Sequence, residues 1–120
     1  MKYMLLIYET AGTREAFFSD EGKELMAAVG EIMAELTASG ELVGGEALAD
    51  PEQARTLRIA GGERVMTDGP FAEAKEQLGG YLLLECETLE RATDVASRWP
   101  MLPSGVLELR PLMGGSGAEM

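Results

Sequence analysis

The distribution of hydrophobic positions predicts four main strands of two kinds. Two segments are apolar at almost every position, which is typical of strands buried on both faces: residues 2–8 and 81–86. Two others are less apolar, and the first of them is interrupted by the pair Gly44-Gly45: residues 41–49 and 106–111. We therefore expect four strands that differ in how deeply they are buried.

Two further segments show the helical spacing of apolar residues. In residues 20–39 an apolar residue recurs every three or four positions, Ser19 is placed as an N-cap, and Gly40 is placed as a C-cap. A second apolar stripe begins after Thr88, another N-cap candidate, and Pro100 ends it. We expect one helix in each segment, with its apolar face turned towards the sheet.

Residues 9–18 are mixed in character and predict a loop with a helical turn. Phe17 and Phe18 follow each other there, and they either cover the core or line a cleft. Further along the chain, Gly61-Gly62 separates two short strand-like segments, which is the signal of a two-residue β-hairpin: residues 55–60 and 63–67.

The order strand, helix, strand, hairpin, strand, helix, strand predicts an α+β fold, a ferredoxin-like split βαβ sandwich with a β-hairpin insertion. The first and third main strands are central in this topology, which agrees with the two most apolar segments. We expect a single domain over residues 1–113 and a disordered tail over 114–120. The sheet face without helices is too apolar along its centre to remain in water, so we expect a homodimer that buries it.

Composition narrows the classes of partner. Ten basic and 21 acidic residues give a net charge of −11 over 120 residues, which argues against nucleic acids and anionic membranes as partners. The apolar part of the amino terminus is too short for a signal or membrane segment, so we expect a cytoplasmic protein. The single cysteine, Cys86, lies in an apolar run and is interpreted as a small buried hydrophobe.

Residues 68–80 carry the candidate chemistry. In a structural interpretation, Asp68 begins a turn, Pro70 starts a helical turn, Phe71 plugs the core and the charged residues are solvated. In a functional interpretation, Asp68 lies in a cleft and acts as a general acid or base, while Lys75 holds an anionic substrate.

Further candidate ligand residues come from the helix-free face and from the turn: Tyr8, Phe71, Tyr81 and Arg110. We predict no cofactor and no metal, because the carboxylates of Asp68, Glu73 and Glu76 follow no pattern of ligand spacing. The chain has no histidine, which excludes Ser–His and Cys–His catalysis and the usual zinc sites.

The segment TDGPFAEAKEQLGG at residues 67–80 resembles the signature of the DGPF group of YCII-related proteins. The resemblance extends to MKYMLLIY at 1–8, LVGGEAL at 42–48 and VLELRPLM at 106–113, and so covers nearly the whole chain. It implies a dimeric α+β barrel, in which two sheets face each other across a two-fold axis. It also implies proposed enzymes with a His–Asp pair, a few of them linked to dechlorination or lyase-type steps on ring compounds, and a regulatory context near sigma factors.

This chain departs from the family pattern at the position of Val29, near which relatives often carry the histidine. Asp68 matches the acidic member of the pair, but its partner is absent. Two hypotheses therefore stand: a dimeric module that binds a small molecule or a protein partner near Asp68, and an enzyme with lyase- or hydrolase-like proton transfer by Asp68. The first is favoured, because imidazole chemistry is not available to this chain.

Overall fold

The computed structural model describes residues 1–114 and contains a four-stranded antiparallel sheet with helices on one face. The strands of this sheet follow the order β2-β5-β1-β6. Their bounds are Lys2–Glu9 for β1, Leu42–Ala47 for β2, Gln77–Glu85 for β5 and Val106–Pro111 for β6. The ferredoxin-like α+β fold is confirmed, with the two most apolar strands in the centre and the other two at the edges.

The alternation of side chains along the two central strands fills the core. Tyr3 and Leu5 of β1 point to the same face as Leu82 and Leu84 of β5, and all four are buried. The helices cover this face. Each fully buried leucine stabilises the folded state by about 1.5–3 kcal/mol relative to the same side chain exposed to water. The prediction that Cys86 is a small buried hydrophobe agrees with its burial in the same cluster.

Three α-helices pack on this face: α1 at Ala11–Phe17, α2 at Lys23–Ser39 and α3 at Leu89–Ser97. The expectation of a loop with one helical turn over residues 9–18 was wrong in extent, because Thr10 caps α1 by accepting a hydrogen bond from the Thr13 N–H. The long helix was predicted from residue 20, but Asp20–Gly22 forms a turn of 3-10 helix before α2 begins.

The stretch after the hairpin also differs from expectation. Residues 69–76 form bends rather than the helical turn expected at Pro70, and β5 begins at Gln77 instead of residue 81. The Gln77 side-chain amide donates to the backbone carbonyls of Ala72 and Ala74, which fixes the bends against the start of β5. Of the predicted tail over 114–120, residues 115–120 lie outside the described part of the chain.

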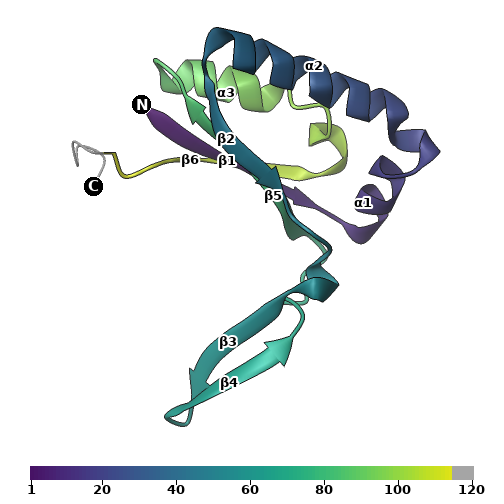
Figure 1. Cartoon of the computed structure of the whole chain (residues 1–120), viewed down its shortest axis with the longest axis vertical. Helices are drawn as coiled ribbons and strands as arrows, with labels where there is room; N and C mark the ends of the chain where they lie inside the picture. Colours follow the sequence, from purple (N-terminus) through teal and green to yellow (C-terminus); the bar gives the residue numbers. More distant parts are fainter. Residues whose placement is uncertain (115–120) are drawn as a thin grey trace.

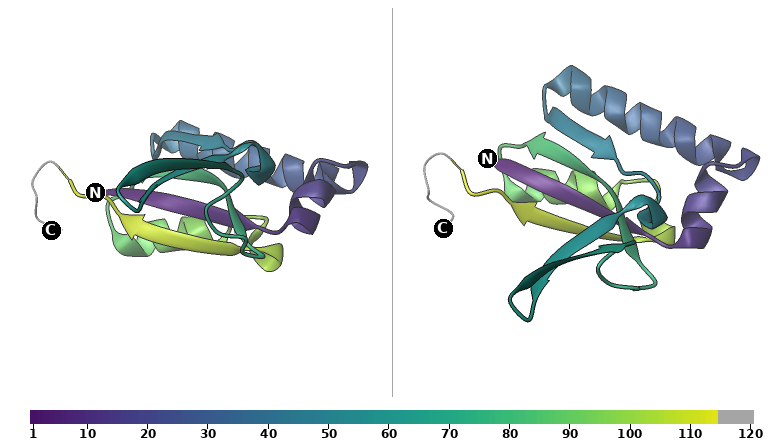
Figure 2. Two further views of the ribbon diagram at one scale, coloured as in Figure 1. Left: turned by 90° about the horizontal axis from the view of Figure 1, so that it is seen from below. Right: turned by 60° about the horizontal axis from the view of Figure 1, so that its bottom comes forward.

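The hairpin insertion forms a two-stranded sheet of its own, with β3 at Arg55–Ala60 and β4 at Glu63–Asp68. Gly61 and Gly62 both have positive φ, as a tight turn of this hand requires. The hairpin stands on the side of the main sheet opposite the helices, and it extends away from the body of the molecule (Figures 1 and 2).

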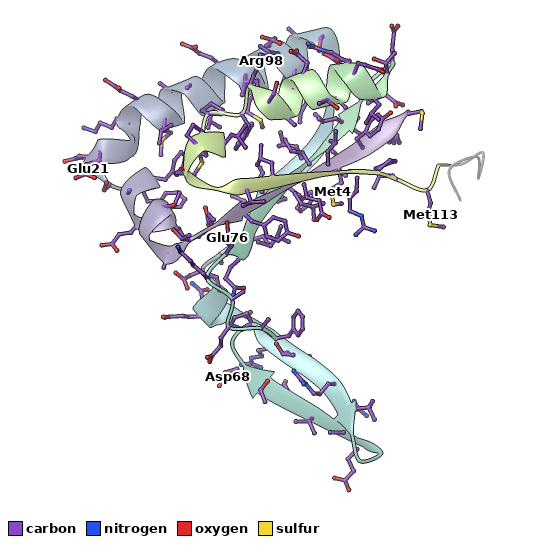
Figure 3. The ribbon with its side chains drawn as sticks, turned by 180° about the vertical axis from the view of Figure 1, so that it is seen from behind. Met4, Glu21, Asp68, Glu76, Arg98 and Met113 are labelled. Atoms are coloured by element: carbon purple, nitrogen blue, oxygen red, sulfur yellow. The ribbon has the colours of Figure 1, made fainter. Side chains whose placement is uncertain are left out.

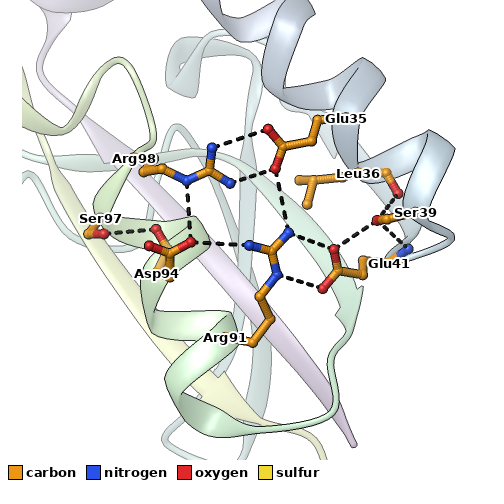
Figure 4. Close-up of polar contacts among 8 residues, drawn as sticks. All are labelled: Glu35, Leu36, Ser39, Glu41, Arg91, Asp94, Ser97 and Arg98. Carbon is orange, nitrogen blue, oxygen red and sulfur yellow. Dashed lines mark hydrogen bonds and ion pairs between the residues drawn. The ribbon is translucent and has the colours of Figure 1, made fainter.

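A network of ion pairs joins the end of α2, the start of β2 and α3 (Figure 4). The Arg91 guanidinium donates to both carboxylate oxygens of Glu41, at 2.7 and 2.8 Å, and also reaches Glu35 and Asp94. Arg98 donates to Glu35 at 2.6 Å. Hydrogen bonds from Arg91 and from the Ser39 hydroxyl lower the pKa of Glu41 from 4.5 to about 2.

We expect Glu41→Gln to lower the melting temperature at pH 7, because the charged carboxylate is stabilised in the folded state. The contribution of Glu41 is fully present above its ordinary pKa of 4.5 and is lost as the pH falls towards about 2. Melting curves between pH 2 and 7 should therefore show the gap between wild type and variant closing over this interval. Glu31→Gln, which removes an exposed carboxylate from α2, is the control. If both variants lowered the melting temperature equally, the stabilising role assigned to the Glu41 carboxylate would be contradicted.

Candidate functional site

A cavity of about 310 Å³ lies between the sheet and the helices, at the end of the sheet where β1 runs into α1. This volume is at the lower end of the range for small-molecule sites. Side chains from the sheet, the helices and the segment after α3 form its apolar wall: Ile7, Phe17, Phe18, Val29, Met33, Leu82, Trp99 and Met101. Of the two roles predicted for Phe17 and Phe18, the lining of a cleft agrees with their place in this wall.

The polar part of the cavity is an ion pair between Arg14 of α1 and Glu9 at the end of β1. Arg14 Nη1 lies 2.7 Å from Glu9 Oε1, and the two side chains are only 18% and 11% exposed. Arg14 Nη2 also donates to the carbonyl of Leu48, at 2.9 Å, and the guanidinium lies 5.2 Å from the ring centroid of Phe18. One arginine thus joins α1, β1 and the segment after β2 around the cavity.

Glycines make room for this ion pair on the neighbouring strand. The pairing of β1 with β5 shifts register between Ile7 and Tyr8, so that Gly79 lies at an irregular point of the ladder. A Cβ on Gly79 would collide with the Glu9 carboxylate. Gly45 of β2 has a φ of +154°, and a Cβ there would come within 2.6 Å of the Tyr81 carbonyl oxygen. Small residues at both positions allow the strands and the Glu9 side chain to approach each other.

Trp99 supplies an unusual buried donor beside the cavity. Its indole N–H is buried and has no hydrogen-bond acceptor among the described residues. A buried donor left without a partner costs about 1–3 kcal/mol. Trp99 is also the chain's single tryptophan, so its fluorescence reports on this one location.

The site residues predicted in the DGPF segment, Asp68, Phe71 and Lys75, do not line this cavity. Asp68 is the last residue of β4, its side chain is 92% exposed, and its nearest ionic partner is Arg55, with Nε 4.0 Å from Oδ1. Figure 3 shows Asp68 on the hairpin side, away from the packed body. Phe71 is 80% exposed, so the expectation that it plugs the core was wrong. Lys75 lies exposed in the bends that follow.

The other predicted residues lie on the helix-free sheet face. The Tyr8 hydroxyl donates to Glu108 Oε1 at 3.2 Å. The pKa of Tyr8 is raised, first by the partial burial of its side chain and second by this hydrogen bond to the Glu108 carboxylate. Arg110 is exposed on β6. Tyr81 borders the cavity, although its alternation with buried Leu82 places its side chain on the helix-free face. Val29, near which the family resemblance places a histidine, lines the cavity itself.

The described residues contain no group of three or more histidine, cysteine, aspartate or glutamate side chains that could hold a metal ion. Burial and the nearby Glu41 carboxylate raise the pKa of the Cys86 thiol, which keeps it protonated and unreactive at neutral pH. In residues 1–114, no helix has both the length and the apolar character needed to cross a membrane.

Sequence reasoning did not single out Glu9 and Arg14. A signal was available: Arg14 is the only basic residue between Lys2 and Lys23, and it follows a carboxylate by five positions across the N-cap of a helix. The two charges therefore had to lie near each other at the start of α1. Their partial burial could not be seen, because it depends on the glycines of β5.

Comparison with known proteins agrees with this fold. The model of the YCII-related domain matches residues 1–114. This chain belongs to the YCII-related family. It is 35% identical over 114 residues to the uncharacterized protein R00369 of Rhizobium meliloti (strain 1021), a match that covers 93% of this chain and 92% of that protein.

A solved structure shares the fold at lower identity. It is 5-chloro-2-hydroxyhydroquinone dehydrochlorinase (TftG) from Burkholderia phenoliruptrix AC1100, in complex with 2,5-dihydroxybenzoquinone. The TM-score is 0.57 and the sequence identity 14%, over 97% of each chain. At this identity the likeness concerns the fold alone.

We expect Arg14→Met to lower the free energy of unfolding by about 1–3 kcal/mol, since it leaves the Glu9 carboxylate and the Leu48 carbonyl without their donor. The double variant Glu9→Gln/Arg14→Met should lose less than the sum of the single variants. Urea unfolding at pH 7 measures all three. Arg55→Met removes an exposed ion pair and should cost about 0.5 kcal/mol or less; strict additivity at Glu9 and Arg14 would show that the pair is not coupled.

Proposed function

We propose that this YCII-related protein binds a small, mainly apolar organic molecule in the cavity between the sheet and the helices, and that it does so as a homodimer. The observation that carries the proposal is the cavity itself: an apolar wall, a partly buried ion pair at one part of it, and an unpartnered indole N–H beside it. Sites for small molecules combine such walls with a few polar groups that fix orientation.

The polar groups of the cavity determine which charge and which hydrogen-bonding groups a ligand needs. Arg14 already has Glu9 and the Leu48 carbonyl as acceptors, so the ligand needs no full negative charge to enter. A hydroxyl or carbonyl oxygen on the ligand would suffice to form a hydrogen bond with the Glu9–Arg14 pair or to accept one from the Trp99 indole N–H. The solved neighbour with this fold carries a small ring compound of that chemical kind, which supports the proposal without fixing the ligand.

The homodimer is proposed to form through the helix-free face of the main sheet. Four large side chains of the two central strands lie half-buried there in register, as two cross-strand pairs: Met4 with Leu83, and Leu6 with Tyr81. A continuous apolar centre on a sheet face requires a cover in a soluble protein. A second copy supplies that cover symmetrically, and it corresponds to the dimeric barrel implied by the family resemblance.

The enzyme hypothesis stays as the second proposal, with Asp68 as general acid or base in a lyase- or hydrolase-like step. The dehydrochlorinase neighbour favours it. Asp68 is 92% exposed and lies outside the lining of the cavity, so a second chain would have to cover its carboxylate to form an enclosed site. Membership of the DGPF group, a cytoplasmic location and a regulatory link to a sigma factor also stay proposals; they rest on the motif, the composition and the family resemblance.

Ligand binding is tested by Trp99 fluorescence and thermal shift with 2,5-dihydroxybenzoquinone and related small phenols. We expect Val29→Phe, which fills the cavity, to weaken any binding by about tenfold or more. Ala27→Phe adds a larger side chain on the exposed face of the same helix and should leave binding unchanged. Equal affinities for wild type and Val29→Phe would place the binding elsewhere, and Asp68→Asn then asks whether it lies at the DGPF turn.

The homodimer is tested by light scattering over a range of protein concentrations. We expect a dimer mass for wild type, and Leu6→Asp should yield monomers because it places a charge at the centre of the buried face. Ala27→Asp, with the same change of charge on the helical side, should remain a dimer. A wild-type monomer mass at every concentration would overturn the proposal.

A further inference from the structure

The hairpin Arg55–Asp68, here called the arm, has too little packing to account for its own stability. β3 and β4 pair with each other and make few contacts with the rest of the chain. An isolated two-stranded hairpin is marginally stable at best in water. In Figures 1 and 2 the arm stands clear of the body, so the rest of the described chain gives it little support.

The two faces of the arm differ in character. The register pairs Leu57 with Met66, and alternation adds Ile59 to the same face. These three side chains, here called the arm patch, are 61%, 56% and 71% exposed in that order. The patch face also carries Arg55, Arg64 and Asp68, while the opposite face pairs Thr56 with Thr67 and Arg58 with Val65. The three largest apolar side chains of the arm therefore share one face, and burying that face would remove the most apolar surface from water.

The arm rises on the side of the main sheet where the proposed dimer partner would lie. The helices are on one side of the sheet and the arm is on the other (Figures 1 and 3). Packed sheets lie about 10 Å apart, and a six-residue strand spans about 20 Å. The arm is therefore long enough to cross the space between two facing sheets and to reach past the partner's sheet.

The charges of the arm and of the body are complementary, so a second copy of this chain is a suitable partner for the arm. The arm carries Arg55, Arg58 and Arg64 against Glu63 and Asp68, a net charge of +1. The whole chain has −11, so the residues outside the arm sum to −12. Each copy therefore offers both a basic arm and an acidic body, and a two-fold axis would form the same contact twice.

We propose that the arm is a clasp: in the homodimer, the arm of each protomer reaches across the two-fold axis and packs the arm patch against the body of the partner. This inference rests on the proposed homodimer and adds a second contact to its sheet-to-sheet interface. The arm then gains the packing that its own chain does not provide, and the dimer gains two attachments outside the central sheets.

Sedimentation equilibrium of point variants tests the contribution of the arm patch. Leu57→Asp and Met66→Asp each place a charge in the patch and should raise the dimer dissociation constant by about tenfold or more. Thr67→Asp makes the same change of charge on the opposite face of the arm and should shift it by less than about twofold. Equal effects of the three variants, or none from the patch variants, would overturn the clasp while the homodimer stands.

A cross-linking experiment decides which chain the arm contacts. A photoreactive benzoylphenylalanine replaces Met66, and light and heavy nitrogen-labelled proteins are mixed before irradiation. Cross-linked peptide pairs with one light and one heavy member, in a product of dimer mass, are expected. Pairs of a single label only would mean that the arm folds onto its own chain, and mixed pairs found only at tetramer mass would assign the arm to a contact between dimers; either result overturns the clasp.

The proposed homodimer itself is controlled separately by Leu6→Asp. If this variant is monomeric while Leu57→Asp and Met66→Asp dimerise as wild type does, only the clasp fails. If the wild type shows no dimer by sedimentation, both the proposed homodimer and the clasp fail together.

Discussion

The register between β1 and β5 decides which side chains enter the core, which border the cavity and which lie on the open face of the sheet. Because side chains alternate along a strand, a slip of one residue would turn the buried side chains of one central strand to the open face of the sheet. The observed register buries Leu5 and Leu82 beneath the helices and brings Leu6 and Tyr81 together on the open face. The irregularity after Ile7 then brings Glu9 against Gly79, where it meets Arg14.

Most of the fold was predictable because its signals are local or repeat along the chain. The apolar runs identified the central strands, helical spacing identified α2 and α3, and Gly61-Gly62 identified the hairpin. The errors lie where one side chain decides the outcome. Thr10 converts an expected loop into α1 by capping it, and the amide of Gln77 holds the preceding residues in bends rather than a helical turn.

The candidate site was harder to predict, because the cavity brings together residues from distant parts of the chain. Glu9, Val29 and Trp99 share no local pattern, and only the packed fold places them around one space. The DGPF motif at residues 68–71 is the reverse case. Its sequence is distinctive, yet the side chains of Asp68 and Phe71 are exposed to solvent in the single chain. A distinctive motif locates a shared structural feature, and it does not by itself locate a ligand.

The lack of histidine limits how the charges of this protein respond to pH near neutrality. Histidine is the side chain whose ordinary pKa lies nearest neutrality, and Glu41 and Cys86, at the ion-pair network, are shifted away from neutral pH. The contrast between a basic arm and an acidic body is therefore not set by modest acidification of the kind that switches histidine-based sensors. Ionic strength is the variable that acts on exposed charges of this kind, since about 0.15 M salt screens them beyond roughly 8 Å.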